Sequence, residues 1–166
     1  IEAYKVADIL AENGVCAAVW ADWWGFKHEA FDMVWENAAI VDQASGGTGC
    51  AIIHSDSSVG IQRLNQEAAK AMAAGNRAGL DIPPSRAIQW ITLNPAKALG
   101  IAGKVGSLEV GKMADVVIWD GNPFSVYTKT EKVFVDGVLL YDKDNPSTPK
   151  ATDFELGIIN SEGDRL

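Results

Sequence analysis

Histidine and cysteine are scarce in this sequence, whose 166 residues contain two of each. His28 and His54 belong to no His-x-His or His-Glu-x-x-His motif, and Cys16 and Cys50 match no zinc spacing. Because a catalytic zinc ion normally takes three protein ligands, these residues alone do not build an ordinary metal site. A Gly-x-Ser-x-Gly nucleophile elbow and a phosphate-binding loop are also missing.

Positive charge is scarce too, since 14 Lys and Arg stand against 22 Asp and Glu, for a formal net charge of −8. Nucleic acids and anionic membrane surfaces are polyanions, so we expect neither as a partner. No apolar run is long enough to span a bilayer. The chain opens at Ile1 inside an amphipathic pattern, without the basic and apolar regions of a signal peptide. We therefore expect a piece of a longer chain or a processed product, with any targeting segment upstream.

Up to about residue 100 the sequence alternates between helical and strand patterns. In the first helical pattern, Val6, Ile9 and Leu10 share one face. Two short apolar runs are typical of strands buried on both faces. The order of helices and strands predicts a parallel α/β sheet. The helical patterns cover residues 1–13, 29–44, 59–79 and 81–100, and the strand patterns cover 15–21 and 50–55.

The two strand segments resemble one another. Residues 16–22 and 50–56 align without a gap, and in each a Cys stands six residues before an Asp. The offset of 34 residues suits one strand-plus-helix unit. If the strands are neighbours, Cys16 and Cys50 lie side by side at the amino ends. We expect two packed free thiols rather than a disulfide, which would need Cα atoms within roughly 7 Å.

Ionisable side chains follow at the carboxyl ends of these strands, the edge where parallel α/β sheets bind ligands. Side-chain alternation directs His54 and Asp56 to the same face. Asp56 could ligate a divalent metal or act as a general base. The alternative is a cap or turn residue before the helix over 59–79.

The other polar and aromatic residues at this edge have plain interpretations as well. His54 taken alone is more typical of a hydrogen-bonded core histidine, and Asp22 of a loop residue. Trp23 and Trp24 could line a pocket or cover the rim of the sheet.

The helical pattern disappears after residue 100. Residues 114–119 predict a strand, and residues 132–142 predict a hairpin around Asp136-Gly137, a strong type I′ turn signal. Residues 143–166 are rich in Pro, Ser, Thr and Asp and predict an extended tail. The chain therefore divides near residue 100 into an α/β part and a small β part.

The segment LNPAKALGIAGKVGSLEVGKMADVVIWDGNPF (93–124), followed by TEKVFVDGVLLY (130–141), resembles the C-terminal end of the amidohydrolase superfamily. Imidazolonepropionase-like and prolidase-type members are especially similar. The resemblance implies a metal-dependent (β/α)8 TIM barrel flanked by a small β-sandwich. Residues 1–100 would be the C-terminal part of the catalytic barrel, with its last two strands and their helices. Residues 101–142 would be the C-terminal part of the sandwich, and 143–166 a tail.

The resemblance also implies roles for residues at the strand ends. Asp56, ending the last barrel strand, would ligate the metal and take the proton from the attacking water. His54, Trp23 and Trp24 are candidates for contact with the substrate. The metal would be a divalent ion, typically zinc, with one or two ions in the full-length enzyme. This chain alone would hold none, because the family's remaining ligands are absent from it.

The leading hypothesis is a fragment of a metal-dependent hydrolase that cleaves C–N bonds in a small amide or dipeptide-like substrate. We expect it to be inactive in isolation and to require the remainder of the barrel from the upstream chain. A truncated barrel leaves open strand edges and bare apolar faces, so we also expect self-association. The alternative is a non-catalytic α/β binding or assembly module, with Asp56 as a helix cap and the β part as an interface.

Overall fold

The computed structural model describes residues 1–145, so the expected tail falls outside the described residues from residue 146 on. The α-helices are α1 (Ala7–Glu12), α2 (Asn37–Gly47), α3 (Leu64–Arg77), α4 (Pro84–Ala87) and α5 (Leu93–Ala98). Short 3-10 helices are η1 (Ala3–Val6), η2 (His28–Ala30), η3 (Ile61–Arg63) and η4 (Ile88–Ile91). The strands are β1 (Cys16–Val19), β2 (Cys50–Ile53), β3 (Val116–Trp119), β4 (Thr130–Val135) and β5 (Val138–Asp142). Within this range, no helix combines the length and the apolar character that crossing a bilayer requires.

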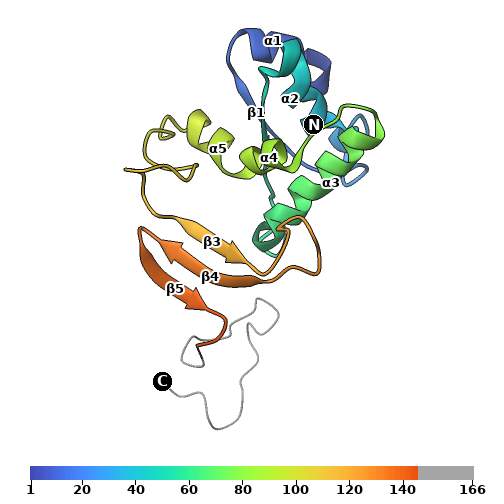
Figure 1. The fold of residues 1–166 in the computed structure, drawn as a ribbon. Coiled ribbons are helices and arrows are strands. Elements are labelled where there is room, and N and C mark those ends of the chain that lie inside the picture. Colours follow the sequence, from blue (N-terminus) through green and yellow to red (C-terminus); the bar gives the residue numbers. More distant parts are fainter. Residues whose placement is uncertain (146–166) are drawn as a thin grey trace.

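Strands β1 and β2 pair in parallel, as the alternation of helix and strand predicts. Cys16 lies opposite Cys50 and Val19 lies opposite Ile53, which confirms the ungapped alignment of the two segments. Helix α2 connects the strands, and α1, α2 and α3 gather around them (Figure 1). The chain therefore has the mixed α/β class that its sequence pattern indicates.

The helices cover one face of this two-stranded sheet and leave the other open. Side chains that alternate along the strands differ in burial accordingly. Those on the covered face belong to the apolar core with residues of α2 and α3: Val19, Ala51 and Ile53. Those on the other face, which we call the open face, are half-buried or exposed: Cys16, Ala18, Cys50 and Ile52. A strand buried on both faces was predicted here, and within the described residues only one face is buried.

Helix α1 buries a different face from the one that its pattern predicts. Val6 and Ile9 are exposed, whereas Ala7 is buried and Ala11 packs against the same core. Small side chains let α1 approach α2 closely, so alanines make the contact and the larger apolar residues face away. Helix α1 ends at Glu12, next to the predicted end of the pattern at residue 13, and Gly14 lies in the left-handed region at φ 64°.

The helix predicted over 29–44 is wrong in its first half. Residues 28–30 form the short η2, and α2 begins only at Asn37. Phe31 and Trp35 share the helical spacing but are exposed, because they lie in the turns between the two helices. The helical spacing of these aromatic residues therefore comes from a loop and does not mark one face of a helix.

Helices α2 and α3 pack closely because α3 carries a glycine at the contact. A Cβ on Gly75 would stand 2.4 Å from the Cβ of Ala39 in α2. Ala68, Ala71 and Ala74 of α3 are buried on the same side, and α3 confirms a helix within the pattern predicted for residues 59–79.

The helical pattern predicted for 81–100 is divided into three short helices. The backbone departs from helical geometry at Thr92, and Asn94-Pro95 lies in the first turn of α5. Proline is tolerated there because the first helical N–H groups have no partner inside the helix.

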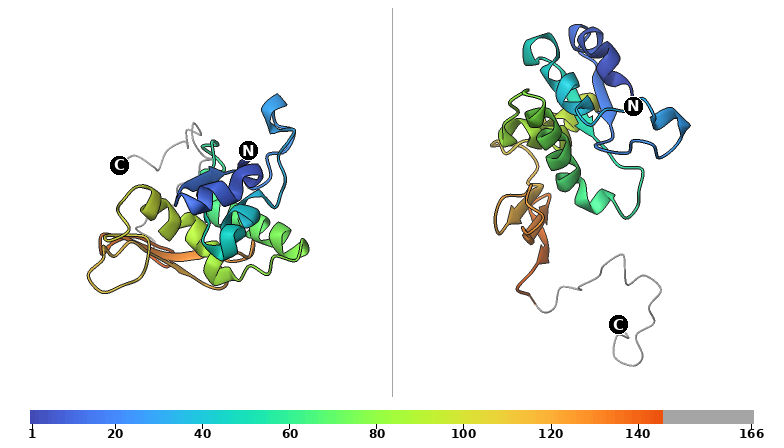
Figure 2. Two further views of the ribbon diagram at one scale, coloured as in Figure 1. Left: turned by 90° about the horizontal axis from the view of Figure 1, so that it is seen from above. Right: turned by 90° about the vertical axis from the view of Figure 1, so that its right-hand side faces the viewer.

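The small β part is an antiparallel sheet of order β3-β4-β5. Asp136 and Gly137 both have positive φ, 49° and 78°, which confirms the predicted tight turn between β4 and β5. The sheet lies below the helices in the right-hand view of Figure 2. It is joined to the α/β part where the Asn65 side chain donates to the Pro123 carbonyl and Phe124 packs against the core.

Cys16 and Cys50 form a disulfide, so the expectation of two free thiols is wrong. Their Cα atoms are 4.5 Å apart, well inside the range that a disulfide needs. The in-register pairing of β1 with β2 sets this distance and points both side chains to the same face.

Candidate functional site

His54 and Asp56 meet just beyond the carboxyl end of β2. The two side chains approach within 3.3 Å, from His54 Nδ1 to Asp56 Oδ1, and both are partly exposed. The His54 backbone N–H donates to the Val19 carbonyl at 3.2 Å, which extends the strand pairing by one residue. The predicted common direction of these two side chains is what the structure shows.

The turn after His54 is held by serines rather than by Asp56. The Ser57 N–H donates to Ser55 Oγ at 3.1 Å, and the Gly60 N–H donates to Ser57 Oγ at 3.0 Å. Neither η3 nor α3 has a side-chain hydrogen bond at its amino-terminal cap. The helix-cap alternative for Asp56 is therefore not seen, and its carboxylate stays directed to His54.

Aromatic side chains border this pair on the β1 side. Trp20, the residue after β1, lies with its ring centroid 5.9 Å from that of His54 and stacks on Trp23 at 4.8 Å. Phe26 meets both tryptophans edge-on. Trp20 is 7% exposed, and its indole N–H has no hydrogen-bond partner among the described residues. Sequence reasoning missed Trp20, although its place one residue past an apolar strand could have pointed to it.

The two tryptophans predicted as a pocket wall have different surroundings. Trp23 belongs to the aromatic group beside His54. Trp24 is 58% exposed, donates its indole N–H to the Phe31 carbonyl at 3.0 Å and contacts the Phe31 ring. The structure places Trp23 against Trp20, the ring next to His54, and leaves Trp24 on the outer loop.

Asp22 at the end of β1 is tied to the helix that follows β2. Lys70 of α3 donates to Asp22 Oδ2 at 2.8 Å and also pairs with Glu67. Partial burial lowers the pKa of Lys70, but hydrogen bonds to Asp22 and Glu67 outweigh it and raise the pKa overall. Asp22 is thus a loop residue, as the sequence predicts, and it is held in an ion pair.

The described residues do not make a complete metal site. No group of three or more His, Cys, Asp or Glu side chains within residues 1–145 is arranged to hold an ion. The strand end offers one carboxylate and one imidazole, and an ordinary catalytic zinc site takes three protein ligands. Any metal bound here would need ligands beyond the part of the chain that the structure describes.

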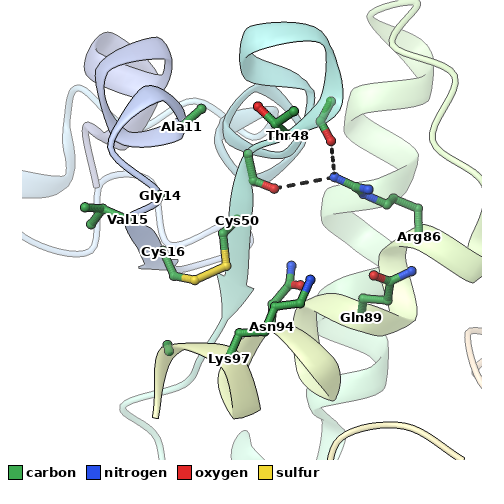
Figure 3. Close-up of a pocket in the computed structure, with 13 residues that line it drawn as sticks. Ala11, Gly14, Val15, Cys16, Thr48, Cys50, Arg86, Gln89, Asn94 and Lys97 are labelled. Carbon is green, nitrogen blue, oxygen red and sulfur yellow. Dashed lines mark hydrogen bonds between the residues drawn. A yellow bond between two sulfur atoms is a disulfide. The ribbon is translucent and has the colours of Figure 1, made fainter. Parts of the chain in front are cut away.

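A pocket of about 640 Å³ lies at the other end of the two strands. The Cys16–Cys50 disulfide, Gln89, Asn94 and Lys97 border it (Figure 3). Asn94 donates its side-chain N–H to the Ala51 carbonyl at 2.8 Å and so ties α5 to β2. Asp56 stands six positions after Cys50, an offset of about 20 Å in extended chain. This pocket and the His54–Asp56 pair are therefore separate places.

Arg86 closes one side of that pocket. Its Nε donates to both carboxylate oxygens of Asp42, at 2.8 and 3.0 Å, and one terminal nitrogen donates to the Gly47 carbonyl at 2.7 Å. These bonds engage the guanidinium in holding the end of α2, so it is not free to bind a ligand.

Comparisons of this chain with a family model, with curated proteins and with solved structures point to the same family. The model of the amidohydrolase family matches residues 35–141, more than half of the chain. The imidazolonepropionase of Shewanella frigidimarina (strain NCIMB 400) is 54% identical over 59 residues, which are 36% of this chain and 13% of that protein. The matched segment is thus a small part of that curated relative.

Solved structures share the fold over most of the chain. An amidohydrolase from Thermotoga maritima MSB8 aligns with a TM-score of 0.72 and 30% identity, covering 86% of this chain and 35% of that one. An adenosine deaminase from Xanthomonas campestris, solved with bound zinc, aligns at 0.63 and 18% identity over 83% of this chain and 34% of its own. This chain therefore spans about a third of such proteins, and it belongs to the amidohydrolase family.

Proposed function

We propose that this chain supplies one part of the catalytic site of a metal-dependent amidohydrolase that hydrolyses C–N bonds. The observation that carries the proposal is the His54–Asp56 pair. It lies at the carboxyl end of a parallel strand, next to the sheet face that the helices leave open. Catalytic groups of parallel α/β enzymes lie at that edge because the loops there converge on one space.

The proposed whole is a (β/α)8 barrel with a small β-sandwich beside it. In this arrangement β1 and β2 are the last two barrel strands, and Ala18 and Ile52 on the open face point to the barrel interior. Cys16 and Cys50, the first residues of the strands, lie at the amino-terminal rim, where the pocket is bordered by the segments that precede both strands. Residues 101–142, with strands β3 to β5, belong to the sandwich. Two facts support this: the chain covers 35% of the Thermotoga amidohydrolase, and α1 to α3 cover only the outer face.

Asp56 is the proposed metal ligand and general base of this chain. An aspartate beside a divalent cation stays ionised at neutral pH, and it can accept a proton from water that attacks a carbonyl carbon. His54, 3.3 Å away, holds the carboxylate in place and is a candidate for contact with the substrate. Zinc is the proposed ion, in line with the zinc-bound deaminase, and polypeptide outside these 166 residues would provide the missing ligands.

The proposed substrate is a small amide or a dipeptide-like compound. Relatives named imidazolonepropionase and prolidase support this class. On this chain, Trp23 is the proposed pocket wall, with Trp24 further out on the same loop. The aromatic surface beside His54 suits a substrate with a flat or apolar group next to the scissile bond.

The test uses the complete gene product that contains these residues, loaded with zinc and assayed on cyclic amides and dipeptides. Asp56→Asn keeps the size of the side chain but removes the base, so we expect a loss in kcat of about 10²–10⁴-fold. The matched control is Asp22→Asn at the end of the neighbouring strand, where only a surface ion pair to Lys70 is lost. Turnover by Asp56→Asn at the rate of the control would refute the proposed role.

A further inference from the structure

The disulfide lies on the open face of the sheet, at the end opposite to the candidate site. Cys16 and Cys50 are the first residues of β1 and β2 and pair directly across the two strands. Since side chains alternate, both sulfurs lie on the open face with Ala18 and Ile52, which α1, α2 and α3 leave uncovered within the described residues. Each strand has four residues, so this single bond fixes one end of a short pairing.

The bond is reachable from solvent. Both cysteines are half-buried and border the pocket of about 640 Å³ at the amino ends of the strands (Figure 3). A thiol or dithiol of small size fits a space of this volume. The pocket thus offers a path to the sulfurs that a disulfide in the packed core would lack.

The pocket also has one cation that is not engaged elsewhere. Lys97 of α5 borders it and is exposed, and its side-chain ammonium makes no hydrogen bond or ion pair within residues 1–145. Arg86, the other cation there, is held by Asp42 and by the Gly47 carbonyl. Lys97 can therefore attract a negatively charged thiol toward the disulfide and stabilise a thiolate released there.

We propose that Cys16–Cys50 is a reversible thiol-exchange site, in which dithiol reductants entering through this pocket release the lock between β1 and β2. A reductant thiolate attacks one cysteine sulfur and forms a mixed disulfide, while the other cysteine leaves as a thiolate and takes up a proton. The second thiol of the reductant then attacks its own sulfur in the mixed disulfide. The net change is two cysteine thiols in the protein and one disulfide in the oxidised reductant, a transfer of two electrons.

Reduction weakens the unit that carries the candidate site. The bond joins residues 34 apart and so closes a loop that contains the whole of α2. Opening it restores freedom to the unfolded chain, and loops of this length make the effect large. We expect the melting temperature to fall on the order of 10 °C on reduction. This inference stands on the cysteines and the pocket and does not depend on the proposed hydrolysis.

The first experiment examines the complete gene product, purified without reductant. Peptide mapping by mass spectrometry should recover residues 16 and 50 in one cross-linked peptide, and dithiothreitol should lower the melting temperature by the stated amount. The double variant Cys16→Ser/Cys50→Ser is the control, and its melting should not respond to dithiothreitol. Alkylation of both cysteines in the native, unreduced protein would overturn the proposal, whether or not the double variant folds.

The second experiment examines the route through the pocket. Lys97→Gln should slow reduction by glutathione, which is anionic, several-fold more than it slows reduction by neutral 2-mercaptoethanol, and added salt should shrink the difference. Lys104→Gln, an exposed lysine outside the pocket lining, is the matched control. If Lys97→Gln and Lys104→Gln change the rates of reduction by glutathione and by 2-mercaptoethanol to the same extent, the role of Lys97 is overturned. A disulfide that native protein protects from both thiols would overturn the exchange site itself.

Discussion

Asp42 is a buried charge that organises the end of α2. Its side chain is fully buried and accepts hydrogen bonds from Arg86 Nε at 2.8 Å and from the Trp90 indole N–H at 2.8 Å. A buried carboxylate is tolerated only when such donors surround it. Through Arg86 the same network reaches the Gly47 carbonyl just before β2. One residue thus ties α2, α4 and η4 together beneath the strands.

Removing this carboxylate should destabilise the chain strongly. Asp42→Ala leaves the Arg86 guanidinium and the Trp90 N–H without their acceptor, so we expect a loss of about 3 kcal/mol in the free energy of unfolding. Urea denaturation of the variant and the wild type measures the difference. Asp22→Ala, which removes an exposed ion pair, should cost at most about 1 kcal/mol. Similar midpoints for the two variants would contradict this account of Asp42.

At the residue scale, the sequence predicted what depends on neighbours along the chain. The common direction of His54 and Asp56 follows from alternation, and the opposition of Cys16 and Cys50 follows from the repeat. The disulfide was missed because packed thiols are the usual state of two cysteines in such a sequence. The partners of Asp42 lie 44 and 48 residues away, and no local pattern indicates contacts of that kind.

At the scale of elements, the close contact of α2 with α3 depends on a missing side chain. Gly75→Ala adds a methyl group 2.4 Å from Ala39 Cβ, and the helices must separate to admit it. Overpacking of this kind outweighs the better helix propensity of alanine, so we expect a net loss of about 1–2 kcal/mol. Gly103→Ala, where a new Cβ meets none of the described residues within 4 Å, is the control and should change little. Thermal melting of both variants checks this, and equal melting temperatures would contradict it.

The β4–β5 hairpin should lose support in acid through Asp142. The Lys132 ammonium and then the Asp144 backbone N–H hold the pKa of the Asp142 carboxyl below its usual value. A carboxyl whose pKa is lower in the folded state stabilises the fold above its unfolded pKa, near 3.9, and that contribution disappears as pH falls through the folded pKa. Asp142→Asn should therefore show a smaller drop in stability than wild type between about pH 5 and pH 2. The urea midpoints of the variant and of the wild type, measured across this range, should converge at the acid end. Parallel curves for the two proteins would contradict this role of Asp142.

Element types were predictable where a local signal was strong, as in the apolar strands and the Asp136-Gly137 turn. The start of α2 was not, because Phe31 and Trp35 imitate a helical stripe while packing in a loop. The buried face of α1 was also missed. Alanine carries a weak hydrophobic signal in sequence, yet Ala7 and Ala11 make the close contacts.

At the scale of the molecule, apolar surface remains uncovered on both parts of the chain. The β3–β5 sheet exposes a group of large apolar side chains: Val117, Ile118, Val135, Val138, Leu139 and Leu140. The open face of β1 and β2 adds Ala18, which is exposed, and Ile52, which is half-buried. Surfaces of this kind are typical of sites where further polypeptide packs.

The isolated 166-residue chain should therefore self-associate. Light scattering over a concentration series should give a mass that rises above that of the monomer of 17.7 kDa. Replacing Val138 and Leu140 by Thr should lower the association without changing the turn between β4 and β5. A monodisperse monomer at all concentrations would contradict the view that these faces need a cover.

The central claim is that Asp56 is one ligand of a metal site whose remaining ligands lie outside this chain. The most direct test is the content of divalent metal in two purified proteins, the isolated 166-residue chain and the complete gene product, after zinc loading and removal of excess metal. The account predicts at least one tightly bound zinc per molecule in the complete gene product and none in the isolated chain. Stoichiometric zinc in the isolated chain, or zinc content in the complete product that survives Asp56→Asn unchanged, would contradict it.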